Sequence, residues 1–471
     1  MDKGCLKLSL VLVIIWACAY HTEASLSLHM DDFIRAVKQV EDEMNPGAKP
    51  VAVLKRLRWV AGLQDPFIQH FLGNVDSSGS EMDAGLLSYI RKAVQHKVTA
   101  DGREEGVVLT SEGTTVALRP LLLGIEAGFI SRFSERVRGL HQLTLAKDLG
   151  LALTHSSNLT QRVGPDGCWD SLTAPRVFTL SDTPTLLTAA HVNGGMDGVV
   201  LGMGVKIRNP LRLSSLLTEY YCHQLDNRGL DAAPRLISRR RRDNFRELVL
   251  PPVLTRHVVK SQELQQRLKM QPQMEVKEKK QLMAAVKEGM KEFVHMFMDC
   301  PPIIPRCMWD AAPYRGTPTN LSLPLSFMYI HHTSTPGEPC LTFQQCSADM
   351  RSMQRFHQED RGWDDIGYSF VAGSDGHIYE GRGWHWQGAH TLGHNSIGYG
   401  VSFIGDYTAS VPSSHSMALV RDRLASCAVG GGRLKPSFIL QGHRQVVNTS
   451  CPGDAFFHEI KSWQHFGEVE N

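Results

Sequence analysis

Residues able to hold a metal ion and to assist hydrolysis are concentrated near the end of the chain. His331 ends one apolar run, Tyr368 opens another, and His443 precedes Cys451 by eight positions. Imidazole nitrogen and thiolate bind zinc readily, and a catalytic zinc site keeps a fourth position open for water. Such a water ionises near neutral pH and can attack a carbonyl carbon. The residue types therefore favour a zinc hydrolase, although a histidine or cysteine at such spacing is more often an ordinary core residue.

The elements that must position these residues alternate between strands and helices over residues 300–471. Apolar and alternating stretches predict strands at 323–330, 368–372, 377–380, 396–404 and 437–440, and helical periodicity predicts helices at 347–360 and 416–428. That order predicts an α/β fold whose C-terminal domain is a central mixed β-sheet flanked by helices. His331 then lies at the end of a buried strand, and His443 begins a loop after another.

The length of the chain, 471 residues, predicts more than one domain. Residues 25–230 carry mostly helical patterns and no catalytic motif, so we expect a mostly α-helical N-terminal domain of unstated role. Residues 231–299 are charged and helical in period, as expected of a connector. A proline-rich stretch that follows Cys300 breaks any helix and marks the start of the last domain, 300–471.

The charge of the chain points to no particular partner. The net charge is +2, with 42% hydrophobic and 21% charged residues. Nucleic acid binding is not predicted, because no domain has an overall excess of basic residues. The densest basic run is Arg239–Arg242. It is either a processing site for a basic-specific protease or a solvated loop, and the loop is favoured.

The N-terminus is typical of a secretory signal. Lys3 and Lys7 precede an apolar run, 8–16, that is too short for a comfortable membrane span. We expect a signal peptide over 1–24, cleaved after Ala19 or after Ala24, and a secreted, extracellular protein without a membrane span in the mature chain. The alternative is a signal anchor that is never cut.

Cysteine usage agrees with an oxidising compartment. Eight cysteines remain after the signal, and six of them follow residue 299, which is dense enough to predict disulfides there. Two sequons, at Asn158 and Asn320, are expected glycosylation sites. A third, at Asn448, lies beside the candidate metal site and is not expected to carry a glycan.

Long strings in the last domain resemble the peptidoglycan recognition protein family, whose fold is similar to that of the phage-type zinc amidases. The matching strings lie at 305–309, 330–333, 355–358, 362–370, 373–384, 388–390, 395–400 and 442–444. Within the family the chain is most similar to the long vertebrate form with a large N-terminal extension. For the N-terminal part the resemblance covers only length and layout.

The resemblance implies a role for each residue that matches a family motif. It makes His331, His443 and Cys451 the zinc ligands. Since neighbouring strand residues face opposite sides, His332 cannot also point at the metal and is expected to pack or to support a ligand. Tyr368 would hydrogen-bond the water or the developing oxyanion. Thr449 would donate to the substrate carbonyl, with a smaller effect than the lysine of phage relatives.

Other matched positions imply a substrate groove. His357, His390 and Asn395 are expected to line it, with a purely structural role as the open alternative. Gly362 with Trp363, and Arg382, resemble the pattern of members that prefer diaminopimelate-type peptidoglycan, because Arg382 could pair with the extra carboxylate. The alternative makes Arg382 a solvated turn residue and Trp363 ordinary core.

The family also implies disulfides. Cys340 with Cys346 matches its short bridge, and Cys300 with Cys427 matches a pair of vertebrate members. Cys168 with Cys222 is left by elimination, and Cys307 is expected to be free.

Two functions compete for the last domain. One is N-acetylmuramoyl-L-alanine amidase activity, which hydrolyses the amide between the lactyl group and L-alanine in bacterial peptidoglycan and its muropeptides, as an antibacterial part of innate immunity. The other is a receptor that only binds. Members that only bind have usually replaced the cysteine ligand, so Cys451 favours the amidase. A separate binding activity of the N-terminal domain is a third possibility.

Overall fold

The computed structural model describes most of the chain. The described residues are 28–44, 47–75, 82–95, 97–98, 104–130, 139–155, 188–204, 212–221, 236–270 and 275–468. The expected signal peptide, Asn158, Cys168 and Cys222 lie outside them. Among the described residues no helix is both long and apolar enough to cross a membrane.

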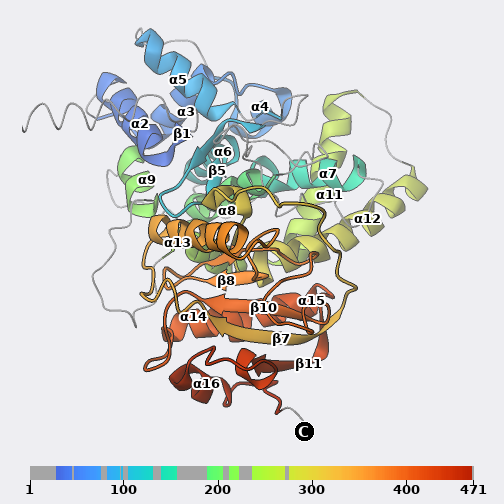
Figure 1. Ribbon diagram of the computed structural model, residues 1–471. Coiled ribbons are helices and arrows are strands. Elements are labelled where there is room, and N and C mark those ends of the chain that lie inside the picture. The colour runs from blue at the N-terminus through green and yellow to red at the C-terminus, as the bar shows by residue number, and fades with distance from the viewer. Residues whose placement is uncertain are drawn as a thin grey trace, which may run out of the picture.

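A six-stranded mixed sheet forms the centre of the C-terminal part, as predicted (Figure 1). Its strands lie in the order β11 (Leu434–Gly442), β7 (Leu325–His332), β10 (Gly398–Phe403), β8 (Phe370–Ala372), β9 (Ile378–Glu380) and β6 (Ile303–Ile304). Strands β11, β7, β10 and β8 pair in parallel, and β9 is antiparallel to β8. Parallel pairing aligns the carboxyl ends of β7, β10 and β11 at one edge of the sheet, where His331 and His443 lie.

Strand alternation divides the sheet into two faces. Met328 and Ile330 of β7 belong to a core that also contains side chains of α15 (Ala425–Gly430) and α16 (Asp454–Ile460). Tyr329 and His331 therefore face the other side. That side is bordered by α13 (Phe343–Arg355), which continues as the π-helical turn Phe356–Asp360. The predicted helix over 347–360 lies within these two segments, and the one over 416–428 within α14 (Ser414–Ala418), the turn Leu419–Leu424 and α15.

The N-terminal region is mostly helical, as predicted, with two small sheets. Its helices are α2 (Met30–Met44), α3 (Pro50–Val60), α4 (Pro66–Leu72), α5 (Ala84–Val94), α6 (Leu118–Ile130), α7 (Lys147–His155), α8 (Ala189–Gly204) and α9 (Leu213–Tyr221). Strand β4 (Val107–Leu109) lies between β1 (Leu28–His29) and β5 (Thr115–Ala117), and β2 (Lys97–Val98) pairs with β3 (Glu104–Glu105).

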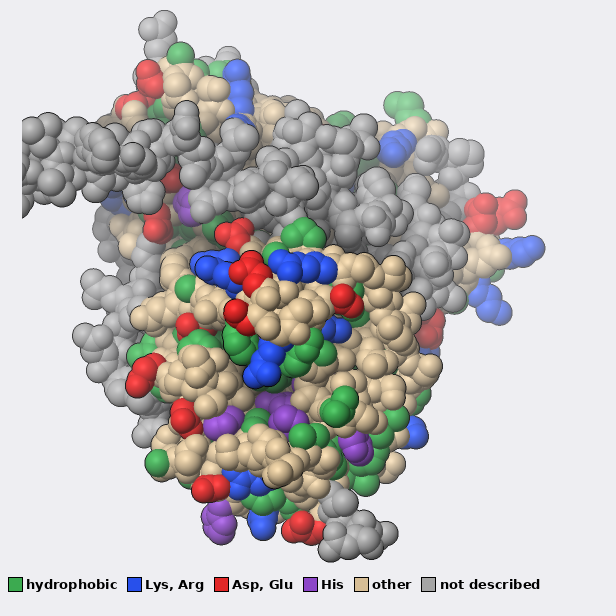
Figure 2. Space-filling view, viewed as in Figure 1, with side chains coloured by type: hydrophobic (Ala, Val, Ile, Leu, Met, Phe, Trp, Pro, Cys, Tyr) green, Lys and Arg blue, Asp and Glu red, His purple; other side chains and the backbone are tan. Residues whose placement is uncertain are grey.

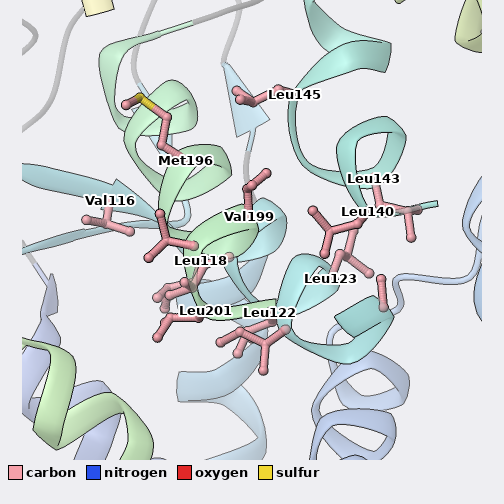
Figure 3. Close-up of a cluster of buried hydrophobic side chains, with 14 of the residues drawn as sticks. Val116, Leu118, Leu122, Leu123, Leu140, Leu143, Leu145, Met196, Val199 and Leu201 are labelled. Atoms are coloured by element: carbon pink, nitrogen blue, oxygen red, sulfur yellow. The ribbon is translucent and has the colours of Figure 1, made fainter. Parts of the chain in front are cut away.

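Helices α6 and α8 form the centre of this region. They approach so closely that a Cβ atom added at Gly124 would lie 2.6 Å from the backbone of Gly198, and one at Gly128 would lie 2.1 Å from Gly202. Leucine and valine side chains around this contact, among them Leu122 and Val199, form the core in Figure 3. Small residues along one stripe of each helix thus allow two apolar helices to bury each other.

Residues 231–299 differ from the expected connector. Where described, they form α10 (Ile237–Leu248), α11 (Pro251–Leu268), α12 (Val276–Val294) and the π-helical turn His295–Asp299. Apolar residues of all four segments, such as Phe245, Val258, Phe293 and Phe297, belong to the same core as α2–α9. The surface charge of these helices resembles that of a linker, but their apolar stripes bury against the N-terminal region.

The arginine run is also not the solvated loop that we expected. It lies in α10, and Arg241 is only 2% exposed. Its guanidinium group donates to both oxygens of Asp197, at 2.7 and 2.8 Å, and the hydroxyls of Tyr220 and Tyr221 donate to the same carboxylate. A buried ion pair of this kind needs such additional donors to offset desolvation.

The two regions contact each other beside α13 and the β8–β9 turn. Glu112 accepts hydrogen bonds from the backbone N–H groups of Ile237 and Ser238, at 3.1 and 2.9 Å, where α10 begins. One of its oxygens also lies 3.8 Å from Nε2 of His377, whose Nδ1 is 3.0 Å from Asp375. The predicted disulfide between Cys300 and Cys427 is present as a second connection.

Candidate metal centre and substrate groove

The three residues expected to bind zinc meet at the carboxyl edge of the sheet. One donor atom from each of His331, His443 and Cys451 lies within 4.8 Å of the others. The Sγ atom of Cys451 is 3.7 Å from Nδ1 of His331, and the rings of His331 and His443 are 4.4 Å apart at their centroids. The spacing is therefore compatible with one ion held by two imidazoles and one sulfur.

Parallel pairing of β7 and β11 accounts for this meeting. Gly442, the last residue of β11, pairs with Ile330, so His443 follows β11 beside His331. The chain then returns to the site through a loop that Arg444 closes, because its backbone N–H donates to the Cys451 carbonyl at 3.0 Å. A cysteine eight positions from a histidine thus reaches the same point in space.

His332 lies on the opposite side of β7, as strand alternation requires. Its Nδ1 accepts a hydrogen bond from the Tyr407 backbone N–H at 3.1 Å and lies 3.7 Å from Asp406. Its own backbone N–H donates to Sγ of Cys451 at 3.4 Å. The ring of His332 thus packs against the Tyr407 backbone and not against Cys451, while its own backbone N–H supports the cysteine.

Burial prepares the imidazoles for metal binding. It lowers the pKa of His331 well below its ordinary value, with further lowering from His443, and it lowers the pKa of His443 to about 4. Both rings are therefore neutral near pH 7 and offer a lone pair. Burial raises the pKa of the Cys451 thiol to about 12, opposed by the His332 N–H and by Arg444. A bound cation would favour the thiolate, so this donor set fits zinc.

Tyr368 and Thr449 lie beside the three ligand-type residues. The Tyr368 ring is 5.4 Å from that of His331, and burial, with Cys451, raises the pKa of its hydroxyl, which keeps its proton for donation. The Thr449 hydroxyl accepts the Cys451 backbone N–H at 3.2 Å. Both residues line the same cavity as the candidate ligands.

Comparison with known proteins identifies the family. A model of the N-acetylmuramoyl-L-alanine amidase domain matches residues 321–454. N-acetylmuramoyl-L-alanine amidases of Mus musculus and Homo sapiens are 40% and 38% identical to this chain, over 95% and 94% of it and 96% and 91% of their own lengths. The chain belongs to the N-acetylmuramoyl-L-alanine amidases of the peptidoglycan recognition protein family.

Two solved structures are each similar to about a third of the amidase chain. Peptidoglycan recognition protein-LE in complex with tracheal cytotoxin, described as monomeric diaminopimelic acid-type peptidoglycan, is 40% identical over 36% of this chain and 96% of its own, with a TM-score of 0.34. Human PGRP-IβC, in complex with a glycosamyl muramyl pentapeptide, is 36% identical over 36% of this chain and all of its own, with a TM-score of 0.34.

A groove of about 1060 Å3 opens over the ligand-type residues of the amidase. Its far wall is the end of α13 and the turn that follows, which supply charged residues of both signs: Asp349, Arg355, Glu359, Asp360 and Arg361. Figure 2 shows such charged side chains above a hollow where histidines gather. Charged groups beside a neutral floor suit a polar, partly charged ligand.

Two of the expected groove residues, His357 and Trp363, line this cavity side by side. Their rings stack with centroids 4.7 Å apart, and Trp363 is 36% exposed, so it is not ordinary core. His357 is buried, its pKa is lowered by burial to about 4, and its Nδ1 accepts the Gly367 N–H. Gly362 is exposed but does not line the cavity.

Arg382 lies neither in the groove nor in solvent. It is 7% exposed, and its guanidinium donates to the carbonyls of Ile366 and Gln387 at 2.8 and 2.9 Å and lies over the ring of Tyr314. Burial lowers its pKa. In this conformation the Arg382 side chain connects the backbone at Ile366, which precedes it, with the backbone at Gln387, which follows it.

His390 and Asn395 differ in their relation to the groove. His390 lines it, with its ring 5.3 Å from that of His331, and burial lowers its pKa to about 3. Asn395 does not line it; its Oδ1 accepts the backbone N–H groups of His390 and Thr391. Sequence reasoning missed Thr391, although its position directly after a matched histidine was an available signal.

Three further cysteines and one predicted glycosylation site lie outside the ligand cluster. The predicted bridge between Cys340 and Cys346 is present just before and within α13, and Cys451 is unpaired. Cys307 lies in the 3-10 turn Arg306–Trp309. Asn320 is exposed, as a glycosylation site must be.

Proposed function

We propose that this amidase is a zinc enzyme that hydrolyses the amide between the lactyl group of N-acetylmuramic acid and L-alanine in bacterial peptidoglycan. The main support is that His331, His443 and Cys451 meet at the floor of the groove, with one donor atom of each within 4.8 Å of the others. A receptor that only binds has no need of this complete donor set.

The residues of the site divide the work of an amide hydrolysis. Zinc, when bound, supplies Lewis acidity and a water nucleophile at neutral pH. His331 and His443 hold it through neutral nitrogens, and Cys451 holds it as a thiolate that accepts the His332 N–H. Tyr368 keeps its hydroxyl proton and donates a hydrogen bond to the oxygen on which negative charge develops. Thr449, whose hydroxyl accepts the Cys451 N–H, orders the cysteine loop beside that oxygen.

We extend the proposal to a preference for diaminopimelate-type stem peptides. Support comes from Trp363 at the groove and from the 40% identical relative whose structure holds such a ligand. Arg382 would have to leave its carbonyl partners to reach a stem carboxylate, whereas Arg361 already lines the groove. Matched lysine and diaminopimelate muropeptides should therefore be compared on wild type, Arg382→Ala and Arg361→Ala. Equal rates on both stems in the wild type would contradict the preference.

We also propose that the protein is secreted after removal of residues 1–24 and works outside the cell on bacterial wall fragments. The apolar N-terminus and the two disulfides support this location. N-terminal sequencing of protein from the culture medium tests it, and retention of Met1 in the exported chain would contradict it.

The test of the enzymatic proposal is release of free stem peptide from purified peptidoglycan. We expect release by the purified full chain, loss after a strong chelator, and recovery on addition of one equivalent of zinc. Binding to peptidoglycan without peptide release, in zinc-loaded protein, would instead identify a receptor.

A further inference from the structure

The hydroxyl of Thr391 lies between two histidines behind the ligand cluster. Thr391 is fully buried, and its Oγ1 is 3.4 Å from Nε2 of His331 and 2.9 Å from Nδ1 of His390. Its two neighbours make it a bridge between one ligand-type imidazole and a second imidazole behind it.

The direction of this bridge follows from which nitrogen of His331 faces the sulfur. Nδ1 is the atom 3.7 Å from Sγ of Cys451, so Nδ1 is the nitrogen available to a metal. Nε2 then carries the hydrogen and donates to Oγ1 of Thr391. The single hydroxyl proton is then free for Nδ1 of His390, the other partner of Oγ1 at 2.9 Å, which accepts it when His390 carries its hydrogen on Nε2.

Thr391 and His390 are both held in place by the surrounding chain. The Oδ1 atom of Asn395 accepts the Thr391 and His390 backbone N–H groups at 2.8 and 2.9 Å. The His390 ring occupies space left by a glycine of β10, since a Cβ atom at Gly400 would lie 2.2 Å from that ring. The bridge is therefore built into the sheet and its adjoining loop.

We propose that Thr391 is a positioning residue that fixes the tautomer and ring orientation of His331 toward zinc, with His390 as the acceptor of its proton. The inference rests on the proposed zinc function. It assigns His390 and Asn395 to the support of a ligand, and it explains why Asn395 lies outside the groove. Hydrogen bonds to the second nitrogen of a metal-binding histidine typically contribute 10–100-fold to metal affinity.

The experiment measures the zinc affinity of the full chain by competition with a chelator of known affinity. Thr391→Val removes the hydroxyl at nearly constant volume, Thr391→Ala removes it without placing a methyl group against His331, and Thr391→Ser retains it. We expect the valine and alanine variants to bind zinc roughly 10–100-fold more weakly and the serine variant to stay close to wild type. Thr144→Val is the matched control, because Thr144 is a fully buried threonine of the N-terminal region whose hydroxyl donates to Leu140.

The outcomes separate this inference from the proposed function. If the wild type binds no zinc, the proposed function fails. If the wild type binds zinc and the valine and alanine variants bind it equally well, only the role of Thr391 fails. A serine variant as weak as the valine variant would also overturn it, because the hydroxyl would then not be the cause. Melting of the zinc-free proteins shows whether any variant has lost its fold.

Discussion

Among the described residues, two clusters combine histidine with cysteine, and one of these two can hold a metal as it stands. In the first, His331, His443 and Cys451 offer two imidazoles and a free thiol. In the second, His295 lies beside Cys300 and Cys427 with comparable spacing, but the two sulfurs are bonded to each other. A disulfide sulfur is not a thiolate and is no substitute for one as a zinc ligand.

The difference comes from where each cysteine lies. Cys300 follows the last helical segment of the N-terminal region and meets Cys427 in helix α15 of the amidase domain, so oxidation joins two parts of the molecule. Cys451 lies in a loop whose near neighbours are histidines. The comparison teaches that residue types and distances locate a candidate metal site, whereas the pairing state of the cysteines decides between chemistry and structure.

Exchange of one cysteine from each cluster gives the largest expected contrast. Cys451→Ser should lower peptide release by more than about 100-fold, beyond the loss typical of residues that only support a ligand. Cys427→Ser should keep most of the activity of each folded molecule. Activity is measured at low temperature on protein shown to be folded by circular dichroism. Equal losses in the two variants would erase the distinction between the clusters.

Removal of the disulfide tests the structural role of the second cluster. The bridge closes 127 residues of sequence, so the double variant Cys300→Ser with Cys427→Ser should be less stable by about 2–4 kcal/mol. Denaturant unfolding under non-reducing conditions measures the change. A difference below about 1 kcal/mol would show that other contacts already join the two regions.

The Glu112–His377 contact offers a pH-dependent test of the same junction. Asp375 and Glu112 raise the pKa of His377 in spite of its burial, and burial raises the pKa of Glu112, which Arg241 and Asp197 also face. The contribution of His377 to the free energy of unfolding is therefore complete below its unfolded pKa, about 6.5. It is lost as the pH rises through its folded pKa. The raised pKa of Glu112 has the same effect: its contribution to stability is complete below its unfolded pKa and is lost as the pH rises through its folded pKa.

His377→Gln should accordingly flatten the fall of unfolding free energy as the pH rises above about 6.5, the pKa of histidine in the unfolded chain. The fall is measured by urea unfolding at each pH, with His458→Gln, an exposed histidine of α16, as control. An unchanged slope in the His377 variant would mean that this contact does not couple protonation to folding.

The smallest effect is expected at the start of α13, the helix that borders the groove. The Thr342 hydroxyl accepts the Gln345 N–H and caps this helix, so Thr342→Ala should cost about 1 kcal/mol while Thr342→Ser costs less. Zinc affinity should not change in either variant. A loss of zinc affinity in Thr342→Ala would show that the groove wall and the metal centre are coupled.

Local patterns in the sequence predicted much of the fold. The apolar run before His331 predicts β7, and the period of two predicts that His331 and His332 face opposite ways, as they do. The family resemblance supplied the two disulfides and the meeting of His331 with His443 and Cys451. Short strands such as β6, with two residues, have no period to detect.

Contacts between distant residues were harder to predict. Arg241 is buried because Asp197, 44 positions away, offers a bidentate partner, and nothing in the arginine run encodes that partner. Arg382 is held by backbone carbonyls, which every residue possesses and no motif marks. The position of Thr391 after a matched histidine was a signal in the sequence, but its contact with His331, 60 positions away, depends on the folded sheet.

The zinc content of three purified proteins tests the central claim most directly. Wild type, Cys451→Ser, and the double variant of Cys300 and Cys427 are dialysed against trace zinc, and bound metal is counted per chain by mass spectrometry. We predict one zinc in the wild type, none in Cys451→Ser, and one in the double variant. Zinc retained by Cys451→Ser, or lost only from the double variant, would contradict the assignment of catalysis to the first cluster and of structure to the second.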